Sequence, residues 1–446
     1  MVTRFLFVCI ICLWTSSSFT QTPPSQLVGH WRGSFIKVNS SQDFQVRFYE
    51  KDGQLQSLQI MEEWHPQFGE FVLPVTIDST NLITFRTGIG AARMRLDTAA
   101  LELNGTLTDQ TPTTYVHLKK IPDPPTPTYT VEAVRMRSGN DTLGGYVHRP
   151  KYAPSRTAII IVGGRGCWTG SPKFDLYAKL LRDYNVTVLA YDKRGTGQSS
   201  GDCATATLDD LAEDVVTIRD YLRRVYPDLQ HIGALGSSAG GWVVARAAEL
   251  TELDFLITVV GPATSVRDQQ LQSMDYGLRE YKLPANSRDD LRAYTELMLD
   301  APVTPDNFAR MQALLKNAKV AGWDQLLDDT DVPADVDAMD QLWVRRHAYD
   351  PARSWRQFDG PVLAVFGERD WIVPLRENTE RLRSFFPNGR TDQLHIVIAP
   401  EGGHSTEAPD QWVKLTDDHR YYRFFRVSPV LSIEVIQFLR KWNYMD

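Results

Sequence analysis

Residues 236–241, with the sequence GSSAGG, restrict the fold of this chain more than any other stretch. An apolar segment over residues 232–235 precedes them, and residues 242–250 carry apolar side chains spaced for one buried face of a helix. The G-x-S-x-G spacing alone also occurs by chance in turns. With these flanks it predicts strand, sharp turn and helix, in which glycines without a Cβ avoid clashes. We expect a strained backbone at Ser238, with its hydroxyl exposed at the start of the helix.

Length and charge limit the class of protein. At about 150 residues per domain, a chain of 446 residues predicts two or three domains. Hydrophobic residues make up 42% of it, as is typical of globular proteins. The net charge of −7 argues against a nucleic-acid partner.

Residues 1–20 have the pattern of a signal peptide. Arg4 is the only early charge, residues 5–14 form an apolar run too short to span a bilayer, and residues 15–20 are small and polar. A buried N-terminal strand or an anchor is the alternative. We expect a secreted or periplasmic protein. No later segment approaches 18 consecutive apolar residues, so no stable membrane insertion is expected after signal removal.

Residues 25–120 predict a small all-β domain. Short segments in which apolar and polar residues alternate are separated by turn signals such as Asp-Gly at 52–53 and Asn-Gly at 104–105. One apolar face per strand predicts a barrel or a sandwich. Residues 121–130 contain four prolines and predict a stiff linker.

Residues 131–446 predict an α/β domain, because buried strands alternate with helices. The strands are expected at residues 130–136, 143–148, 158–162, 186–190, 232–235, 255–260, 361–366 and 395–398. The insertion at 263–358 lacks strand patterns and contains helix starts, including Thr304 followed by Pro305. We interpret it as a helical cap over the active edge of the sheet.

Two residues that follow later strands complete a catalytic pattern with Ser238. Asp370 comes just after one strand and His404 just after the last one. A serine hydroxyl needs an imidazole to take its proton, and the imidazole needs a carboxylate to orient it. We therefore predict a Ser238–His404–Asp370 triad. Asp359 and Glu401 are the alternative acids.

The negatively charged oxygen formed in such chemistry needs two backbone N–H donors. The first is predicted to be that of Ala239, directly after the serine. The second is expected from the small-residue loop 163–166, with the sequence GGRG. Arg165 is the preferred donor and Gly166 the alternative. A glycine turn without a donor role also fits this loop.

These motifs together resemble the α/β-hydrolase superfamily. They are GGRG at 163–166, YDKRGTGQSSG at 191–201, the 236–241 turn, GERD at 367–370 and GH at 403–404. More narrowly, the chain resembles exported esterases and dipeptidyl-peptidase-like hydrolases with a small β domain before the catalytic one. The resemblance implies cleavage of an ester, thioester or amide through an acyl-serine, without metal or cofactor. In this family Asp192 and Arg194 usually brace the loop that carries them.

Other residues near the predicted site allow more than one interpretation. Cys167 and Cys203 lie on neighbouring loops, where a disulfide is permitted in an exported protein. Several aromatic side chains fit either an acyl pocket or ordinary packing. They are Trp168, Tyr276, Tyr281, Trp323, Trp343 and Tyr349.

The sequence thus predicts a secreted serine hydrolase acting on a small acyl ester. A short peptide is the alternative substrate, although no Glu-Glu pair for a free amino terminus occurs in the insertion. An acyltransferase would use the same residues. A non-catalytic binding protein is the alternative from another class, and the oligomeric state has no signal in the sequence.

Overall fold

A computed structural model describes residues 24–37, 40–60, 70–87, 90–108, 113–124, 126–167, 173, 175–284, 287–387, 389–407 and 427–445. The predicted signal peptide at 1–20 lies outside these residues. Most of the chain falls into two compact units, with the main boundary between Asp123 and Pro124. This division falls in the proline-rich stretch that separates the two patterns of the sequence.

The first unit is a closed antiparallel barrel that follows the short helix α1 (Pro24–Leu27). Its strands are β1 (Gly29–Lys37), β2 (Ser40–Lys51), β3 (Gln54–Ile60), β4 (Glu70–Ile77), β5 (Ile83–Thr87), β6 (Gly90–Asp97), β7 (Glu102–Leu107) and β8 (Thr114–Ile121). The pairing of β1 with β8 closes the barrel, which decides between barrel and sandwich. Trp31 is fully buried inside, and its Nε1 donates to the carbonyl oxygen of Leu27 at 2.8 Å.

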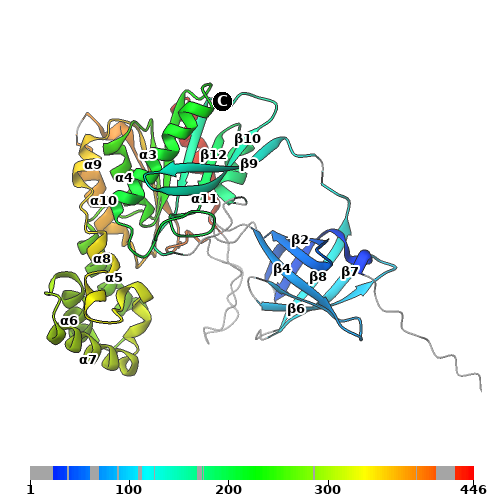
Figure 1. Cartoon of the computed structure of the whole chain (residues 1–446), viewed down its shortest axis with the longest axis horizontal. Helices are drawn as coiled ribbons and strands as arrows, with labels where there is room; N and C mark the ends of the chain where they lie inside the picture. Colours follow the sequence, from blue (N-terminus) through cyan, green and yellow to red (C-terminus); the bar gives the residue numbers. More distant parts are fainter. Residues whose placement is uncertain are drawn as a thin grey trace, which may run out of the picture. The chain divides into compact units, whose positions relative to one another are not determined.

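The second unit is built on an eight-stranded mixed sheet (Figure 1). Its strands are β9 (Tyr129–Ser138), β10 (Asp141–Pro150), β11 (Thr157–Val162), β12 (Thr187–Tyr191), β13 (His231–Ser237), β14 (Leu256–Val259), β15 (Val362–Gly367) and β16 (Leu394–Ala399). The order is β16-β15-β14-β13-β11-β12-β10-β9, and the strands from β11 to β16 run parallel. The carboxyl ends of these strands therefore share one edge.

Helices cover both faces of this sheet, as the fully buried parallel strands require. The helices that accompany the sheet are α2 (Leu176–Arg182), α3 (Leu208–Val225), α4 (Gly240–Leu250), α9 (Ala352–Gln357), α10 (Leu375–Ser384) and α11 (Pro429–Lys441). Of these, α9 falls within the predicted insertion at 263–358 but contacts α4. The apolar residues of α3, α4 and α10 pack in one core cluster, and those of α2 and α11 pack in another. The predicted α/β-hydrolase architecture is confirmed.

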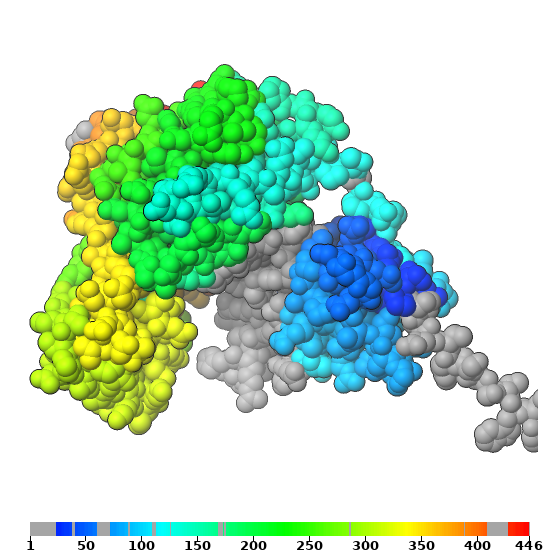
Figure 2. Space-filling model, viewed as in Figure 1, coloured from blue at the N-terminus to red at the C-terminus, as the bar shows by residue number. Residues whose placement is uncertain are grey.

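Residues 266–346, between β14 and β15, form a separate group of helices, drawn in yellow-green and yellow in Figures 1 and 2. It contains α5 (Val266–Glu280), α6 (Ser287–Asp300), α7 (Pro305–Ala321), α8 (Trp343–Arg346) and the short 3-10 helices η2 (Trp323–Leu326), η3 (Asp329–Asp331) and η4 (Asp337–Met339). The helix start predicted at Thr304 is present, since its side chain accepts from the Asn307 amide.

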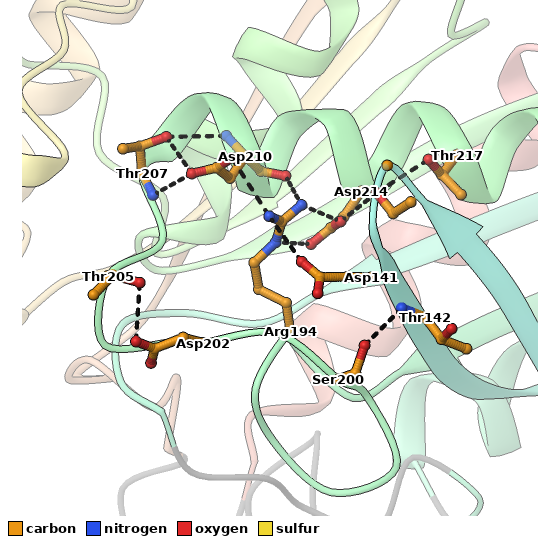
Figure 3. A network of polar contacts seen from close by, with 12 residues as sticks. Asp141, Thr142, Arg194, Ser200, Asp202, Thr205, Thr207, Asp210, Asp214 and Thr217 are labelled. Atoms are coloured by element: carbon orange, nitrogen blue, oxygen red, sulfur yellow. Dashed lines mark hydrogen bonds and ion pairs between the residues drawn. The ribbon is translucent and has the colours of Figure 1, made fainter.

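The loop after β12 is braced by Arg194 (Figure 3). The guanidinium of Arg194 lies 2.6 Å from Asp214 Oδ1 and 3.4 Å from Asp210 Oδ1, both on α3. It also lies 3.7 Å from Asp141 Oδ2 at the start of β10. The network therefore joins the loop after β12 and the start of β10 to α3. Asp214, at its centre, is fully buried.

Candidate active site

Ser238 occupies a strained turn between β13 and α4. Its φ angle is 52°, in the left-handed region that side chains other than glycine rarely adopt. The Ser238 amide donates to Val259 O at 2.9 Å, which holds the turn against the neighbouring strand. A Cβ on Gly236 would lie 2.2 Å from Gly240 O, and one on Gly240 would lie 2.5 Å from Val162 O. The two glycines are therefore needed for the turn that presents Ser238.

Three side chains that lie far apart in the sequence meet at the carboxyl edge of the sheet. Nε2 of His404 lies 2.8 Å from Oγ of Ser238, and Nδ1 of His404 lies 2.9 Å from Oδ2 of Asp370. The other carboxylate oxygen of Asp370 accepts from the amides of Ile372 and Val373, each at 2.9 Å. Asp370 is only 3% exposed. Its carboxylate is therefore held in place by the protein, and it can in turn orient the imidazole. This arrangement lets the imidazole take a proton from the serine.

The charge state of His404 depends on two carboxylates. Burial opposes the charged form of the imidazole, but Asp370 and, more weakly, Glu407 outweigh burial and raise the pKa of His404 above its ordinary value. Oε2 of Glu407 is buried and has no hydrogen-bond partner among the described residues. Sequence reasoning missed Glu407, because nothing in the pattern of the chain points to its proximity to His404.

The two alternative acids lie elsewhere. Asp359 precedes β15, so it lies at the opposite end of that strand from Asp370, and it is exposed. Glu401 forms an ion pair with Arg369 at 3.6 Å. Neither has a described hydrogen bond to His404, whose Nδ1 faces Asp370.

The predicted N–H donors lie on either side of the serine. Ala239 is the N-cap residue of α4, where helical amides have no carbonyl partner within the helix. Arg165 follows β11, and the adjacent Gly164 packs against Ser238, since a Cβ on Gly164 would lie 3.0 Å from the Ser238 Cβ. The Arg165 side chain turns to the insertion, where it lies 2.6 Å from Asp331 Oδ1 and 4.6 Å from the centre of the Trp343 ring. Cys167, in the same loop, forms a disulfide with Cys203.

A cavity of about 350 Å³ opens at Ser238 and His404. The insertion supplies Gln269, Gln270, Ser273, Met274, Leu326, Leu327, Asp328 and Asp331 to its wall, and Trp371 and Ile372 complete it. None of the five described aromatic candidates lines this cavity, and Trp168 lies outside the described residues.

The described part of the chain offers little for other classes of site. Across it, no group of three His, Cys, Asp or Glu side chains could hold a metal ion. No helix in the same residues is long and apolar enough to cross a bilayer.

The profile of the Alpha/beta hydrolase family matches residues 158–415, which is more than half of the chain. The chain therefore belongs to the alpha/beta hydrolase family, and the resemblance seen in the motifs is confirmed. No curated protein matches the sequence at a significant level.

Several solved structures are similar to this chain at low identity. An esterase from Pyrococcus furiosus shares 15% identity over 70% of this chain and 92% of its own, with a TM-score of 0.44. Est1E from Butyrivibrio proteoclasticus, with ferulic acid bound, shares 18% over 69% and 98%, with a TM-score of 0.44. A proline iminopeptidase from Mycobacterium smegmatis shares 17% over 62% and 92%, with a TM-score of 0.41. At these values the similarities say nothing of what this chain acts on.

Proposed function

We propose that this protein is a serine hydrolase that cleaves carboxylic esters through an acyl-serine intermediate. The proposal rests on two hydrogen bonds of His404, one to Ser238 and one to the buried Asp370. Such a hydrogen-bond network turns a weakly nucleophilic hydroxyl into a reactive one. The strained backbone of Ser238 supports the same role, because such strain concentrates at functional sites.

The reaction proceeds in two halves. Ser238 Oγ bonds to the acyl carbon while its proton passes to Nε2 of His404. The carbonyl electron pair moves to the oxygen, which the amides of Ala239 and Arg165 stabilise. When the tetrahedral intermediate collapses, the alcohol leaves with the proton from His404. Water then repeats the sequence on the acyl-serine, releases the acid and restores Ser238.

Two features of the cavity favour an ester over a peptide with a free amino terminus. Such a peptide needs a buried, unpaired acid for its ammonium group, and neither acid in this wall is both buried and unpaired: Asp331 is buried and Asp328 is exposed. Asp331 pairs with Arg165, and Asp328 accepts from the amide and the hydroxyl of Thr330. Met274, Leu326 and Ile372 give the wall apolar surface for an acyl chain. We further propose that the insertion acts as a cap, since it supplies much of this wall.

The nucleophile is tested with a fluorophosphonate probe. We expect wild-type protein to be labelled and Ser238→Ala to remain unlabelled. Ser237→Ala is the matched control, because its hydroxyl lies one residue away on the same turn and should not be needed for labelling. Absence of labelling in the folded wild type would favour a non-catalytic binding protein.

The substrate class is tested with p-nitrophenyl esters against aminoacyl anilides. We expect the esters to be turned over faster, with short acyl chains preferred because the cavity is small. Faster turnover of the anilides would show a peptidase instead. Transfer of the acyl group to an added alcohol in preference to water would show an acyltransferase.

We also propose export from the cytoplasm, with removal of residues 1–20. The apolar run at 5–14 supports this, as does the disulfide between Cys167 and Cys203, since such bonds persist in oxidising compartments. Expression in the native host should give extracellular or periplasmic protein whose N-terminal sequence begins near Gln21. Recovery of uncleaved protein from the cytoplasm would contradict export.

A further inference from the structure

The loop at 163–166 contains the Arg165 amide. Lys193 contacts this loop on the side that faces away from Ser238. Its Nζ donates to Gly164 O at 2.5 Å and to Gly166 O at 3.0 Å. The topology brings these residues together, because β11 and β12 are parallel neighbours and the two loops follow their carboxyl ends. Lys193 belongs to one cavity, with Gly166 and Cys167, whereas Gly164 and Arg165 line the other cavity with Ser238. The loop therefore separates the lysine from the serine.

The geometry of the peptide bond links these contacts to the reaction. In a trans peptide the C=O of one residue and the N–H of the next point in opposite directions. A Gly164 carbonyl held by Lys193 therefore turns the Arg165 N–H to the other side of the loop, where Ser238 lies. Lys193 does not bind the Arg165 carbonyl. It therefore does not orient the next peptide group, which carries the Gly166 N–H. This favours Arg165 over Gly166 as the second donor.

The loop needs such a restraint because glycine makes its peptide groups easy to rotate. Residues 163, 164 and 166 are glycines, and Gly166 has a φ of 101°, which glycine adopts at little cost. A hydrogen bond from a charged donor is roughly twice as strong as a neutral one. Burial lowers the pKa of Lys193 to about 8, so the ammonium form, with three donors, predominates at neutral pH.

We propose that Lys193 is a positioning residue that orients the Arg165 amide toward the negatively charged oxygen of the reaction. This inference rests on the proposed function. Lys193 does not line the cavity at Ser238, so it acts through the loop and not on the substrate. The Cys167–Cys203 disulfide anchors the same loop at its far end.

The test is Lys193→Met, which keeps the length of the side chain and removes its donors. For a p-nitrophenyl ester we expect kcat to fall by roughly 10- to 100-fold with KM changed less than about threefold, because the oxygen is charged only in the transition state. Affinity for a phenylboronic acid, which forms a tetrahedral adduct with the serine, should fall in parallel. Lys193→Arg, which restores charged donors, should recover part of kcat. Lys151→Met is the control, since Lys151 Nζ also donates to a backbone carbonyl, that of Pro127 at 3.0 Å.

Each rate is divided by the number of sites that react with fluorophosphonate. Unfolded molecules are then not counted, so they cannot be mistaken for a fall in kcat. The inference is overturned if Lys193→Met keeps kcat per reactive site within twofold of wild type. It is also overturned if KM rises as much as kcat falls. If Lys193→Met does not fold, Lys193→Gln, with neutral donors, replaces it with the same expected split. A folded wild type that neither reacts with the probe nor cleaves esters would contradict the proposed function itself.

Discussion

At the scale of single residues, His404 has two acidic neighbours with different tasks. Asp370 contacts the imidazole directly and is held by two amides, whereas Glu407 acts on His404 only through its charge. The first carboxylate fixes the orientation of the ring, and both raise its pKa. The contribution of charge can therefore be tested at Glu407 without disturbing the hydrogen bonds of the triad.

We predict that Glu407→Gln moves the acid limb of the pH–activity profile to lower pH. His404 takes a proton only when it is neutral, so activity rises as the pH passes its pKa. Removing a negative charge lowers that pKa, and we expect a shift of roughly 0.3 to 1 pH unit in kcat/KM. Glu401→Gln is the control, because Glu401 lies on the same loop and pairs with Arg369. An unchanged limb in Glu407→Gln, or an equal shift in both variants, would contradict the prediction.

The residues of the proposed triad were easier to single out from the sequence than the residues around them. Ser238, Asp370 and His404 stand next to strand ends in an order that the sequence displays. Lys193 and Glu407 have no such local signal, because their proposed roles come from contacts with residues distant in the sequence. The five described aromatic candidates do not line the cavity at Ser238, which agrees with ordinary packing, the other interpretation of the sequence. Residue type alone did not decide between the two, because it does not say which way a side chain points.

At the scale of elements, the buried pair of Arg194 and Asp214 joins the loop after β12 to α3 (Figure 3). Removing one member leaves an uncompensated charge. We therefore predict that Arg194→Met lowers the free energy of unfolding by about 3–5 kcal/mol. Urea denaturation followed by circular dichroism measures this.

The control for Arg194→Met is another arginine–aspartate pair in the same unit. Arg267 and Asp300 lie 2.5 Å apart, but their side chains are 51% and 56% exposed. Arg267→Met should therefore cost less than about 1 kcal/mol. Equal losses in the two variants would show that burial does not set the strength of the Arg194 pair.

The sheet was predictable because most of its parallel strands contain a short continuous apolar run. β16 at the sheet edge is the exception, with His395 in its run and Ile398 exposed. The predicted strand at 158–162 corresponds to β11, Thr157–Val162, and the one at 395–398 to β16, Leu394–Ala399. The choice between barrel and sandwich was not predictable. It depends on the pairing of β1 with β8, which joins residues as far apart in the sequence as His30 and Ile121 and which no local pattern encodes.

At the scale of the whole molecule, each of the two units has its own core. Trp31 is fully buried within the barrel, and its ring lies 6.4 Å from that of Phe48. We predict two unfolding transitions in scanning calorimetry, because separate cores unfold separately unless they are strongly coupled. Trp31→Ala should lower only one transition, with a loss of about 3–5 kcal/mol in that unit.

Ester hydrolysis well below both transitions should be the same in Trp31→Ala and in wild type, since the proposed triad belongs to the other unit. Phe255→Ala is the matching variant in the α/β core, because Phe255 is also fully buried, and it should lower the other transition. A single transition that both variants shift together would contradict independent unfolding.

The Cys167–Cys203 bond has a practical consequence for anyone who purifies this protein. A newly made chain lacks the bond and must be oxidised after synthesis, so material from a reducing cytosol will be a mixture of linked and unlinked molecules. Specific activity will then follow the thiol content of each batch. Counting free sulfhydryls before the assay will distinguish low activity of the linked enzyme from a lack of the disulfide bond.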